Sequence, residues 1–343
     1  MNALTMPSNW QRVRLGDIAE IIGGGTPSTQ VASFWNGSIN WFTPTEIGIT
    51  KYVHKSQRTI TLLGLKKSSA KLLPIGTILL TSRASIGDCA ILKVVATTNQ
   101  GFQSLIPLEK INNEFLYYLM LTLKNKLLKL ASGSTFLEVS PNKIKNLLIP
   151  LPPLNEQIAI ANVLSDADHY LYSLDALILK KESVKKALSF ELLSQRKRLK
   201  GFNQNWQKIR LGDICEITTG SLDANEMVHY GKYRFYTCAK EYYFIDKYAF
   251  DTEAILISGN GAYVGYVHYY KGKFNAYQRT YVLDNFSEHI IFVKYFLTMF
   301  LQSHIQTNRN EGNTPYIVMA TLKDFEILLP PLNEQIAIAN ILS

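Results

Sequence analysis

The sequence contains few of the features that mark a secreted, disulfide-stabilised or membrane-bound protein. Its 343 residues include only three cysteines, Cys89, Cys215 and Cys238, which are too few and too scattered for a disulfide framework. No run of eighteen or more apolar residues occurs, so we expect no membrane span, and the N-terminus lacks the pattern of a secretion signal. The hydrophobic fraction of 47% is ordinary for a globular protein and excludes a disordered chain. We therefore expect a globular protein of a reducing, cytoplasmic compartment.

The motifs of common catalytic centres are also missing. The glycine-rich segment GGGTPST (23–29) lacks the lysine of a phosphate-binding loop and is interpreted as an ordinary loop. The two LPPL motifs are not preceded by the polar residue with which an amino-methyltransferase holds its target amine. The six histidines are isolated and show no metal-ligand spacing. We therefore expect no catalytic residue, no metal site and no cofactor in this chain.

The positive charge is concentrated in one segment. The formal net charge is +9, and ten basic residues but only two acidic ones lie between Lys180 and Arg210. Such a segment is typical of phosphate contact or of an acidic partner surface, and on charge alone a solvated helix end is an equally good interpretation. The residues predicted to contact phosphate or a partner are Lys185, Lys186, Arg196, Lys197 and Arg198.

The chain contains two copies of one unit. NWQRVRLGDIAEI (9–21) returns as NWQKIRLGDICEI (205–217), an offset of 196, and LPPLNEQIAIANVLS (151–165) returns as LPPLNEQIAIANILS (329–343), an offset of 178. Between these anchors the copies diverge, although Gly87 matches Gly265 and Gln100 matches Gln278 at the second offset. This layout indicates constant pieces that meet a shared scaffold and variable pieces that read two different targets.

Each copy is predicted to be a compact α+β domain rich in antiparallel strands. β-Branched and aromatic runs such as 76–82 and 101–107 in the first copy, and 254–258 and 279–284 in the second, indicate strands. A helix is expected after them in each copy, over 111–131 and 288–307. The predicted domains are 1–154, a spacer helix over 155–200, a second domain over 201–332, and the start of another helix over 333–343.

The spacer helix carries an apolar stripe that it cannot bury alone. No proline or glycine occurs between Asn155 and Gly201, and apolar residues recur at alternating spacings of three and four. Such a stripe requires a partner helix, as in a coiled coil. Its predicted seam consists of Leu164, Ala167, Leu171, Leu174, Ile178, Leu188, Leu192 and Leu199.

Amide, hydroxyl and guanidinium side chains beside the predicted strands favour DNA groove reading. Asn and Gln pair with adenine, Arg pairs with guanine, and Ser, Thr and Lys typically hold phosphates. For any single residue an ordinary turn position is the better interpretation, and Gln100 and Gln278 rank higher because they match between the copies. The candidates in the first copy are Thr43, Lys51, Arg83, Ser85, Asn99, Gln100, Ser134 and Thr135. Those in the second copy are Lys240, Asn260, Tyr263, Gln278, Arg279, Arg309, Asn313 and Thr314.

These anchors together resemble a known family. NWxxxxLGDI opening a domain, LPPLNEQIAIAN closing it, a long helix and a KGFxxNW re-entry at 200–206 are similar to the specificity subunits of type I restriction–modification systems. The resemblance implies two target recognition domains, each reading one half of a bipartite double-stranded DNA site. It also implies that the long helices form a coiled coil that sets the distance between the half-sites.

The resemblance further implies partners and their cofactors. Two methyltransferase (M) subunits would dock on the helices, and restriction (R) subunits would join through them. S-adenosylmethionine, ATP and Mg²⁺ would then belong to these partner subunits and not to this chain.

One departure leaves alternatives open. Family members usually continue into a second long helix, whereas this sequence stops at Ser343. The chain is then a truncated form that pairs with a second specificity chain, a recombination cassette, or an inactive product. A stand-alone nuclease or methyltransferase with a diverged site, and an interaction scaffold without a DNA role, are the rival hypotheses.

Overall fold

The computed structural model describes residues 7–132, 137–308 and 315–343. They divide into two compact units, Met1–Leu174 (unit 1) and Asp175–Ser343 (unit 2). The candidates Ser134, Thr135, Arg309, Asn313 and Thr314 lie outside the described residues.

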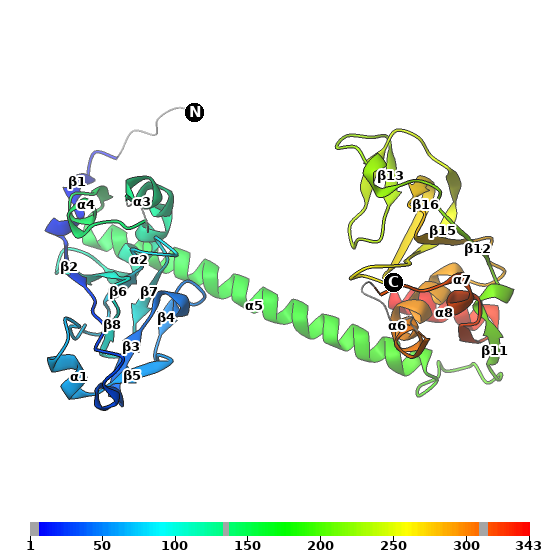
Figure 1. Ribbon diagram of the computed structural model, residues 1–343, viewed down its shortest axis with the longest axis horizontal. Helices are drawn as coiled ribbons and strands as arrows, with labels where there is room; N and C mark the ends of the chain where they lie inside the picture. Colours follow the sequence, from blue (N-terminus) through cyan, green and yellow to red (C-terminus); the bar gives the residue numbers. More distant parts are fainter. Residues whose placement is uncertain (1–6, 133–136, 309–314) are drawn as a thin grey trace. The chain divides into compact units, whose positions relative to one another are not determined.

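Unit 1 contains three sheets with short helices around them (Figure 1). The five-stranded sheet has the order β2-β9-β6-β7-β4, with β2 (Ala19–Gly23), β4 (Tyr52–Val53), β6 (Ile78–Leu80), β7 (Cys89–Leu92) and β9 (Gln103–Pro107). The three-stranded sheet has the order β5-β3-β8, with β3 (Trp35–Phe42), β5 (Arg58–Ile60) and β8 (Ala96–Thr98), and β1 (Gln11–Arg14) pairs with β10 (Leu148–Leu151). The α-helices are α1 (Leu62–Lys66), α2 (Asn113–Thr122), α3 (Lys124–Leu130) and α4 (Pro141–Lys145), and the 3₁₀ helices are η1 (Leu15–Asp17), η2 (Ala32–Phe34) and η3 (Pro44–Glu46).

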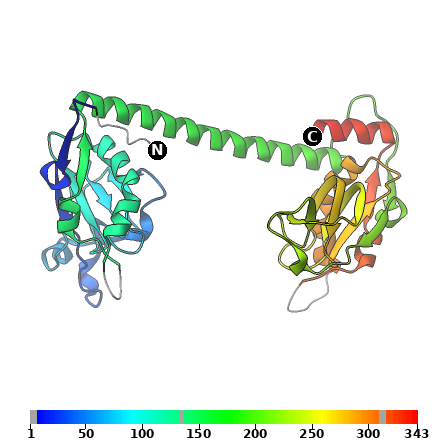
Figure 2. The same ribbon diagram turned by 90° about the horizontal axis from the view of Figure 1, so that it is seen from above.

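Unit 2 contains one larger sheet and one strand pair (Figure 2). The six-stranded sheet has the order β12-β17-β15-β16-β13-β14, with β12 (Glu216–Thr219), β13 (Tyr233–Tyr236), β14 (Tyr243–Ile245), β15 (Phe250–Ser258), β16 (Val267–Ala276) and β17 (Thr280–Asp284). β11 (Gln207–Arg210) pairs with β18 (Glu326–Leu329). The helices are α6 (Ile290–Asn308), α7 (Met319–Lys323) and α8 (Leu332–Leu342), with the 3₁₀ helices η4 (Leu211–Asp213) and η5 (Ala224–Glu226).

The two units share one framework. The order β2-β9-β6-β7 in unit 1 matches β12-β17-β15-β16 in unit 2, and α2 packs on β6 and β7 as α6 packs on β15 and β16. Leu105 and Leu283 are fully buried at matching core positions, and so are Ile144 and Leu322. Most strand pairs are antiparallel, although β3 pairs in parallel with β8, β4 with β7 and β13 with β16. The α+β class and the duplicated domain are therefore confirmed. Each unit then adds one antiparallel strand, β5 on β3 and β14 on β13, and unit 1 differs by the additional β4 and α1 in this interval.

The long helix α5 (Leu154–Leu193) has 40 residues and is about 60 Å long at about 1.5 Å per residue. The predicted seam residues Leu164, Leu171, Ile178 and Leu188 are between 37% and 58% exposed. Along this stretch the helix therefore keeps an uncovered apolar stripe, as its sequence pattern predicts.

The predicted end of the helix at residue 200 is corrected. The helix stops at Leu193, and Gln195 has a positive φ of 62°, a conformation that ends a helix. Leu192 is buried in the core of unit 2, and Leu199 lies beyond the helix against the same core. Both residues pack in or against the core of unit 2, because the last turn of α5 enters that core before the end of the predicted seam.

The repeated sequence NEQ binds the start of a helix to the rest of each unit. The buried Gln157 side chain donates to the carbonyls of Pro152 (2.9 Å) and Lys110 (3.1 Å) and accepts from the Asn112 amide (2.9 Å). In unit 2 the buried Gln335 donates to the Pro330 carbonyl (2.8 Å) and accepts from the His289 amide (3.0 Å). Each glutamine therefore satisfies backbone groups of two distant segments at the point where the helix begins.

The glutamate of NEQ has different partners in the two units. Glu156 accepts hydrogen bonds from the Asn9 amide (3.0 Å) and the Trp10 indole (2.9 Å), both neutral donors. Glu334 accepts from the Trp206 indole (3.2 Å) and forms a two-point ion pair with Arg198, at 2.7 and 3.3 Å. The Glu334 side chain is only 1% exposed. The interpretation of Arg198 as a phosphate contact is corrected, because its guanidinium is committed to this buried carboxylate.

This difference predicts unequal stability effects of one substitution made in both repeats. Glu334→Ala leaves the Arg198 charge unpaired, so we expect the free energy of unfolding of unit 2 to fall by about 3 kcal/mol. Glu156→Ala removes only hydrogen bonds to neutral donors, so unit 1 should lose about 1 kcal/mol. Hydrogen exchange of the β6 and β15 amides in increasing urea measures each unit separately. Equal losses in the two units would contradict the assigned role of Arg198.

Candidate nucleic-acid interface

In unit 1, four segments that are far apart in sequence meet at one end of the sheet. The Ser82 amide donates to the Gly101 carbonyl (2.8 Å), and the Ser82 carbonyl accepts from the Val139 amide (3.1 Å). The Gly25 amide donates to the Thr98 carbonyl (2.9 Å) and joins the glycine-rich loop to the same place. We call residues 24–28, 81–88, 98–102 and 137–139 the first loop cluster.

Unit 2 repeats the two bonds of the Ser82 backbone, and a third bond with the opposite donor joins the loop after β12 to the same place. The Gly259 amide donates to the Arg279 carbonyl (2.8 Å), and the Gly259 carbonyl accepts from the Ile317 amide (2.9 Å). The Gln278 amide donates to the Leu222 carbonyl (2.9 Å). Residues 220–223, 258–266, 277–280 and 315–317 form the second loop cluster. The loops that diverge most in sequence therefore occupy matching positions on one framework.

Glycines allow these loops to pack closely. Gly87 and Gly265 have positive φ values of 90° and 80°, and their amides close equivalent turns on the carbonyls of Thr81 (3.0 Å) and Ser258 (2.7 Å). Gly24 lies so close to the backbone of residues 98–99 that a side chain there would collide with it, and Gly220 lies equally close to Ala276. The match between Gly87 and Gly265 in the sequence therefore reflects a shared backbone turn.

The first loop cluster brings four of the predicted residues together. Arg83 pairs with Glu138 at 2.8 Å and keeps 43% of its side chain exposed. The Asn99 side chain accepts from the Gly101 amide (2.8 Å), so it shapes the turn that carries Gln100. Gln100 is exposed, and its side-chain oxygen accepts from the Thr26 hydroxyl. Ser85 lies in the same turn as Gly87.

The second loop cluster brings together Asn260, Tyr263, Gln278 and Arg279, and Lys240 reaches it from outside. The Lys240 ammonium lies 5.2 Å from the centre of the Tyr263 ring, a cation–π distance. Tyr263 is 44% exposed, and Gln278 and Arg279 are also exposed. Among the described residues, the Gln278 side chain makes no hydrogen bond.

Two predicted residues of unit 1 lie outside the loop cluster. Thr43 donates its hydroxyl to Glu46 (2.8 Å) and caps η3, directly after the strand that leads to the cluster. Lys51 is corrected from a DNA contact to an internal residue, since its side chain is only 12% exposed and its ammonium pairs with Glu114 at 2.5 Å. The basic residues Lys185, Lys186, Arg196 and Lys197 are exposed and stay predicted phosphate or partner contacts.

Sequence reasoning missed several residues that the fold brings to these clusters. Thr26 contacts Gln100 from the glycine-rich loop, and Cys238 lies with its Sγ 3.3 Å from the Arg279 carbonyl oxygen. One sequence signal could have pointed to the glycine-rich loop. A glycine recurs at the offset of 196, as Gly24 and Gly220, directly after β2 and β12.

An aromatic surface with one cation between its rings adjoins the second loop cluster. Arg234 lies 4.2 Å from the ring centre of Tyr242 and 4.5 Å from that of Tyr270. Beside it, the His268 Nε2 bonds the Ala239 carbonyl (2.9 Å) next to Lys240, and burial lowers the pKa of His268. His268 thus supports the segment that carries Lys240.

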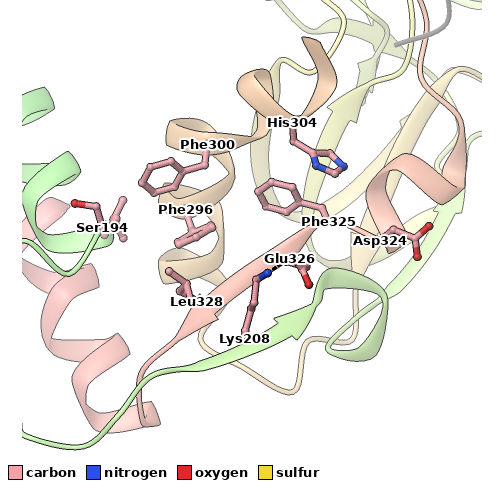
Figure 3. Close-up of a pocket in the computed structure, with 10 residues that line it drawn as sticks. Ser194, Lys208, Phe296, Phe300, His304, Asp324, Phe325, Glu326 and Leu328 are labelled. Carbon is pink, nitrogen blue, oxygen red and sulfur yellow. Dashed lines mark ion pairs between the residues drawn. The ribbon is translucent and has the colours of Figure 1, made fainter. Parts of the chain in front are cut away.

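A mainly apolar pocket of about 370 Å³ lies where the end of α5 meets α6 and β18 (Figure 3). Ser194 and His304 stand on opposite sides of Phe296 and Phe300 in this pocket, and Lys208 pairs with Glu326 at its rim. His304 Nε2 bonds the Thr321 carbonyl (3.0 Å).

Within residues 7–132, 137–308 and 315–343, no group of histidine, cysteine and acidic side chains is arranged to hold a metal ion. None of the helices in this part of the chain has the length and apolarity needed to cross a membrane.

Comparison with known families decides what this duplicated framework is. The sequence pattern of the type I restriction modification DNA specificity domain matches residues 7–181 and 203–343. The chain belongs to this family. Both matches span one copy of the framework, so the duplicated unit is the specificity domain itself.

Named relatives agree with the specificity family. The type I restriction enzyme MjaIX specificity subunit of Methanocaldococcus jannaschii is 30% identical over 364 residues, covering 95% of this chain and 84% of the relative. The EcoprrI specificity subunit of Escherichia coli is 25% identical, with 96% of this chain and 85% of the relative covered. The EcoDI specificity subunit of Escherichia coli is 41% identical over 138 residues, covering 39% of this chain and 30% of the relative.

Solved structures share the specificity-domain fold. The S subunit of a type I restriction–modification system from M. genitalium matches with a TM-score of 0.64 and 18% identity, covering 100% of this chain and 90% of that one. The HsdS subunit from Thermoanaerobacter tengcongensis matches with a TM-score of 0.56 and 20% identity, covering 99% and 90%.

The three cysteines of this specificity-family chain provide a test of the second loop cluster. Burial raises the pKa of Cys89 and of Cys215 to about 12, so at pH 8 neither thiol ionises enough to react. Cys215 and Cys238 are both half-buried, so the raised pKa is what should keep Cys215 slow. Iodoacetamide should therefore modify Cys238, whose Sγ lies beside the Arg279 carbonyl, at least tenfold faster than the other two. Bound duplex DNA should slow the modification of Cys238 severalfold, as measured by mass spectrometry. An unchanged rate at saturating DNA would place the DNA contacts elsewhere, and Cys215 in the same unit is the internal control.

Proposed function

We propose that this chain is the DNA-specificity subunit of a type I restriction–modification complex and that each loop cluster reads one half of a bipartite duplex site. The observation that carries the proposal is the equivalence of the two clusters. Two matching backbone bonds hold both, and an exposed glutamine, Gln100 or Gln278, lies in each. The other exposed side chains differ, with Arg83 in unit 1 and Lys240 and Tyr263 in unit 2. One framework with two sets of side chains suits two different half-sites.

The exposed basic residues supply contacts that do not depend on base sequence. Lys185, Lys186 and Lys197 are exposed, and Arg196 lies over the Phe190 ring at 4.7 Å, which keeps its guanidinium at the surface. Lysines at such positions hold phosphates or an acidic protein surface.

Chemistry on DNA is assigned to partner subunits. The uncovered stripe of α5 at Leu164, Leu171, Ile178 and Leu188 supports docking of other helices, either from M subunits or from a second specificity chain. S-adenosylmethionine, ATP and Mg²⁺ would be bound by the M and R subunits, and this chain itself would be non-catalytic. A cytoplasmic location belongs to the same proposal, since all three cysteines are free.

Methylome sequencing tests the proposed function. DNA exposed to this chain together with its M subunits should carry a methylated motif with two dissimilar halves around an unspecified gap. A palindromic motif would show that two chains assemble and that one unit dominates the reading. Methyl transfer or cleavage by the chain alone would overturn the non-catalytic role.

Matching substitutions in the two clusters should affect different half-sites. Gln278→Ala removes an exposed amide suited to a base edge, so discrimination at one position of one half-site should fall by about 1–3 kcal/mol. Gln100→Ala should act in the same way on the other half-site. Binding to a site library measures both effects.

The exposed lysine provides the matched control. Lys197→Ala should weaken binding to every sequence alike and reduce the salt dependence of log K by about 1. If all three variants gave the same sequence profile, the proposed division between base and phosphate contacts would be wrong.

A further inference from the structure

A polar network holds the first turns of α5 on unit 1. The Lys51 ammonium lies 2.5 Å from the Glu114 carboxylate on α2, 3.0 Å from the Tyr118 hydroxyl on α2, and 3.2 Å from the Ser165 hydroxyl on α5. The Tyr118 hydroxyl in turn donates to Asp168 on α5 at 2.6 Å. The network therefore joins the segment before β4, helix α2 and helix α5, which lie side by side in Figure 1.

Every hydrogen-bond donor of the Lys51 ammonium has an acceptor in this network. An ammonium has three hydrogen atoms, and Lys51 has three oxygen acceptors at bonding distance. Tyr52 donates to the second oxygen of Glu114 at 2.7 Å. Burial and the bond to Asp168 raise the pKa of Tyr118, so its hydroxyl stays a donor. Polar networks in which every member is satisfied make a structure rigid and select one arrangement.

The contacts along α5 are spaced so that they fix its direction. Gln157 holds the helix near its start, and Ser165 and Asp168 hold it two to three turns later, up to about 16 Å away along the axis. A helix held at one point can pivot, whereas one held at two separated points cannot. From Asp168 to the end of the helix is about 37 Å, so a change of about 6° would move that end by about 4 Å. That displacement exceeds the rise of one base pair, about 3.4 Å.

Among the described residues of unit 2, the positions that match Glu114 and Tyr118 form no such network. At the offset of 178, Phe292 and Phe296 replace Glu114 and Tyr118, and both are buried in the core. The end of α5 is held there by Leu192 and Leu193 in the core and by Phe190, whose ring lies 6.1 Å from that of Phe300. The polar attachment is therefore particular to unit 1.

We propose that Lys51 is a positioning residue that fixes the direction of α5 on unit 1 and thereby the spacing between half-sites that the protein accepts. This inference rests on the proposed function. Lys51 acts through Glu114, Tyr118 and Ser165 and does not touch DNA.

The test is a series of bipartite sites in which both halves are constant and the spacer varies by one base pair. In the complex with its M subunits, Lys51→Met should reduce the preference for the best spacer over its neighbours at least fivefold and leave both half-site motifs unchanged. Lys51→Arg, which keeps the charge and donors, should retain more of the preference. Lys93→Met is the matched control, because Lys93 lies 4.1 Å from the Tyr52 ring but is exposed and outside the network.

A second readout separates the attachment from DNA recognition. In the free 343-residue chain, Lys51→Met and Tyr118→Phe should each speed hydrogen exchange of residues 162–175 at least fivefold, and Lys93→Met should not. An unchanged spacer profile with Lys51→Met would overturn the proposal. So would a changed base preference in one half-site, which would make Lys51 a DNA contact. If the wild-type complex showed no bipartite site, the proposed function and the role in spacing would both fail, while the exchange data would still decide whether Lys51 holds α5.

Discussion

The rest of each unit depends on one buried amide. Gln157 and Gln335 are both 1% exposed, and each bonds the backbone at the end of the last strand and at the entrance to the helix that covers the sheet. An unsatisfied buried amide costs about 1–3 kcal/mol, so the three segments can only come together in one way. The amide closes each unit and fixes the point at which α5 or α8 begins.

Once the unit is closed in this way, its other end is free to vary. The loop clusters are joined across their segments by backbone bonds, such as those of Ser82 and Gly259, with a few side chains such as Asn99 shaping single turns. Side chains there can change without loss of the framework, provided that the glycines stay where the chains approach closely, as at Gly24 and Gly220. The repeated segments are constant because their side chains, such as Gln157 and Gln335, make bonds that the fold needs. The loop clusters can vary because backbone groups make most of the bonds between their segments.

Local patterns and the repeat predicted much of this structure. The strands and the long helix follow from the apolar runs. The equivalent placement of Gln100 and Gln278 follows from the repeat offsets, because matching positions in a duplicated fold occupy matching places. Thr26 was missed because nothing in its own segment shows that residues 98–102 lie beside it.

The predictions for Lys51, Arg198, Leu192 and Leu199 failed for a common reason. The local pattern places Lys51 and Arg198 at the surface and the two leucines in a helix seam, whereas each side chain contacts a group that is distant in sequence. Lys51 meets Glu114 and Ser165, Arg198 meets Glu334, and the two leucines meet the core of unit 2. Charge and periodicity are local properties of the sequence. The environment of each of these side chains is instead decided by a tertiary contact that the local sequence does not show.

The two attachments of α5 differ in their chemistry, and this difference has a mechanical meaning. Apolar contacts such as those of Leu192 and Leu193 are non-directional and tolerate small rotations, since their free energy depends on buried area. Hydrogen bonds weaken steeply away from their preferred angles, so the network of Lys51, Tyr118 and Asp168 tolerates much less. Small rotations of the helix are therefore easier at its attachment to unit 2, while the network resists them at unit 1. Under the proposed role in spacing, one stiff attachment is enough, and a second stiff one would only add strain.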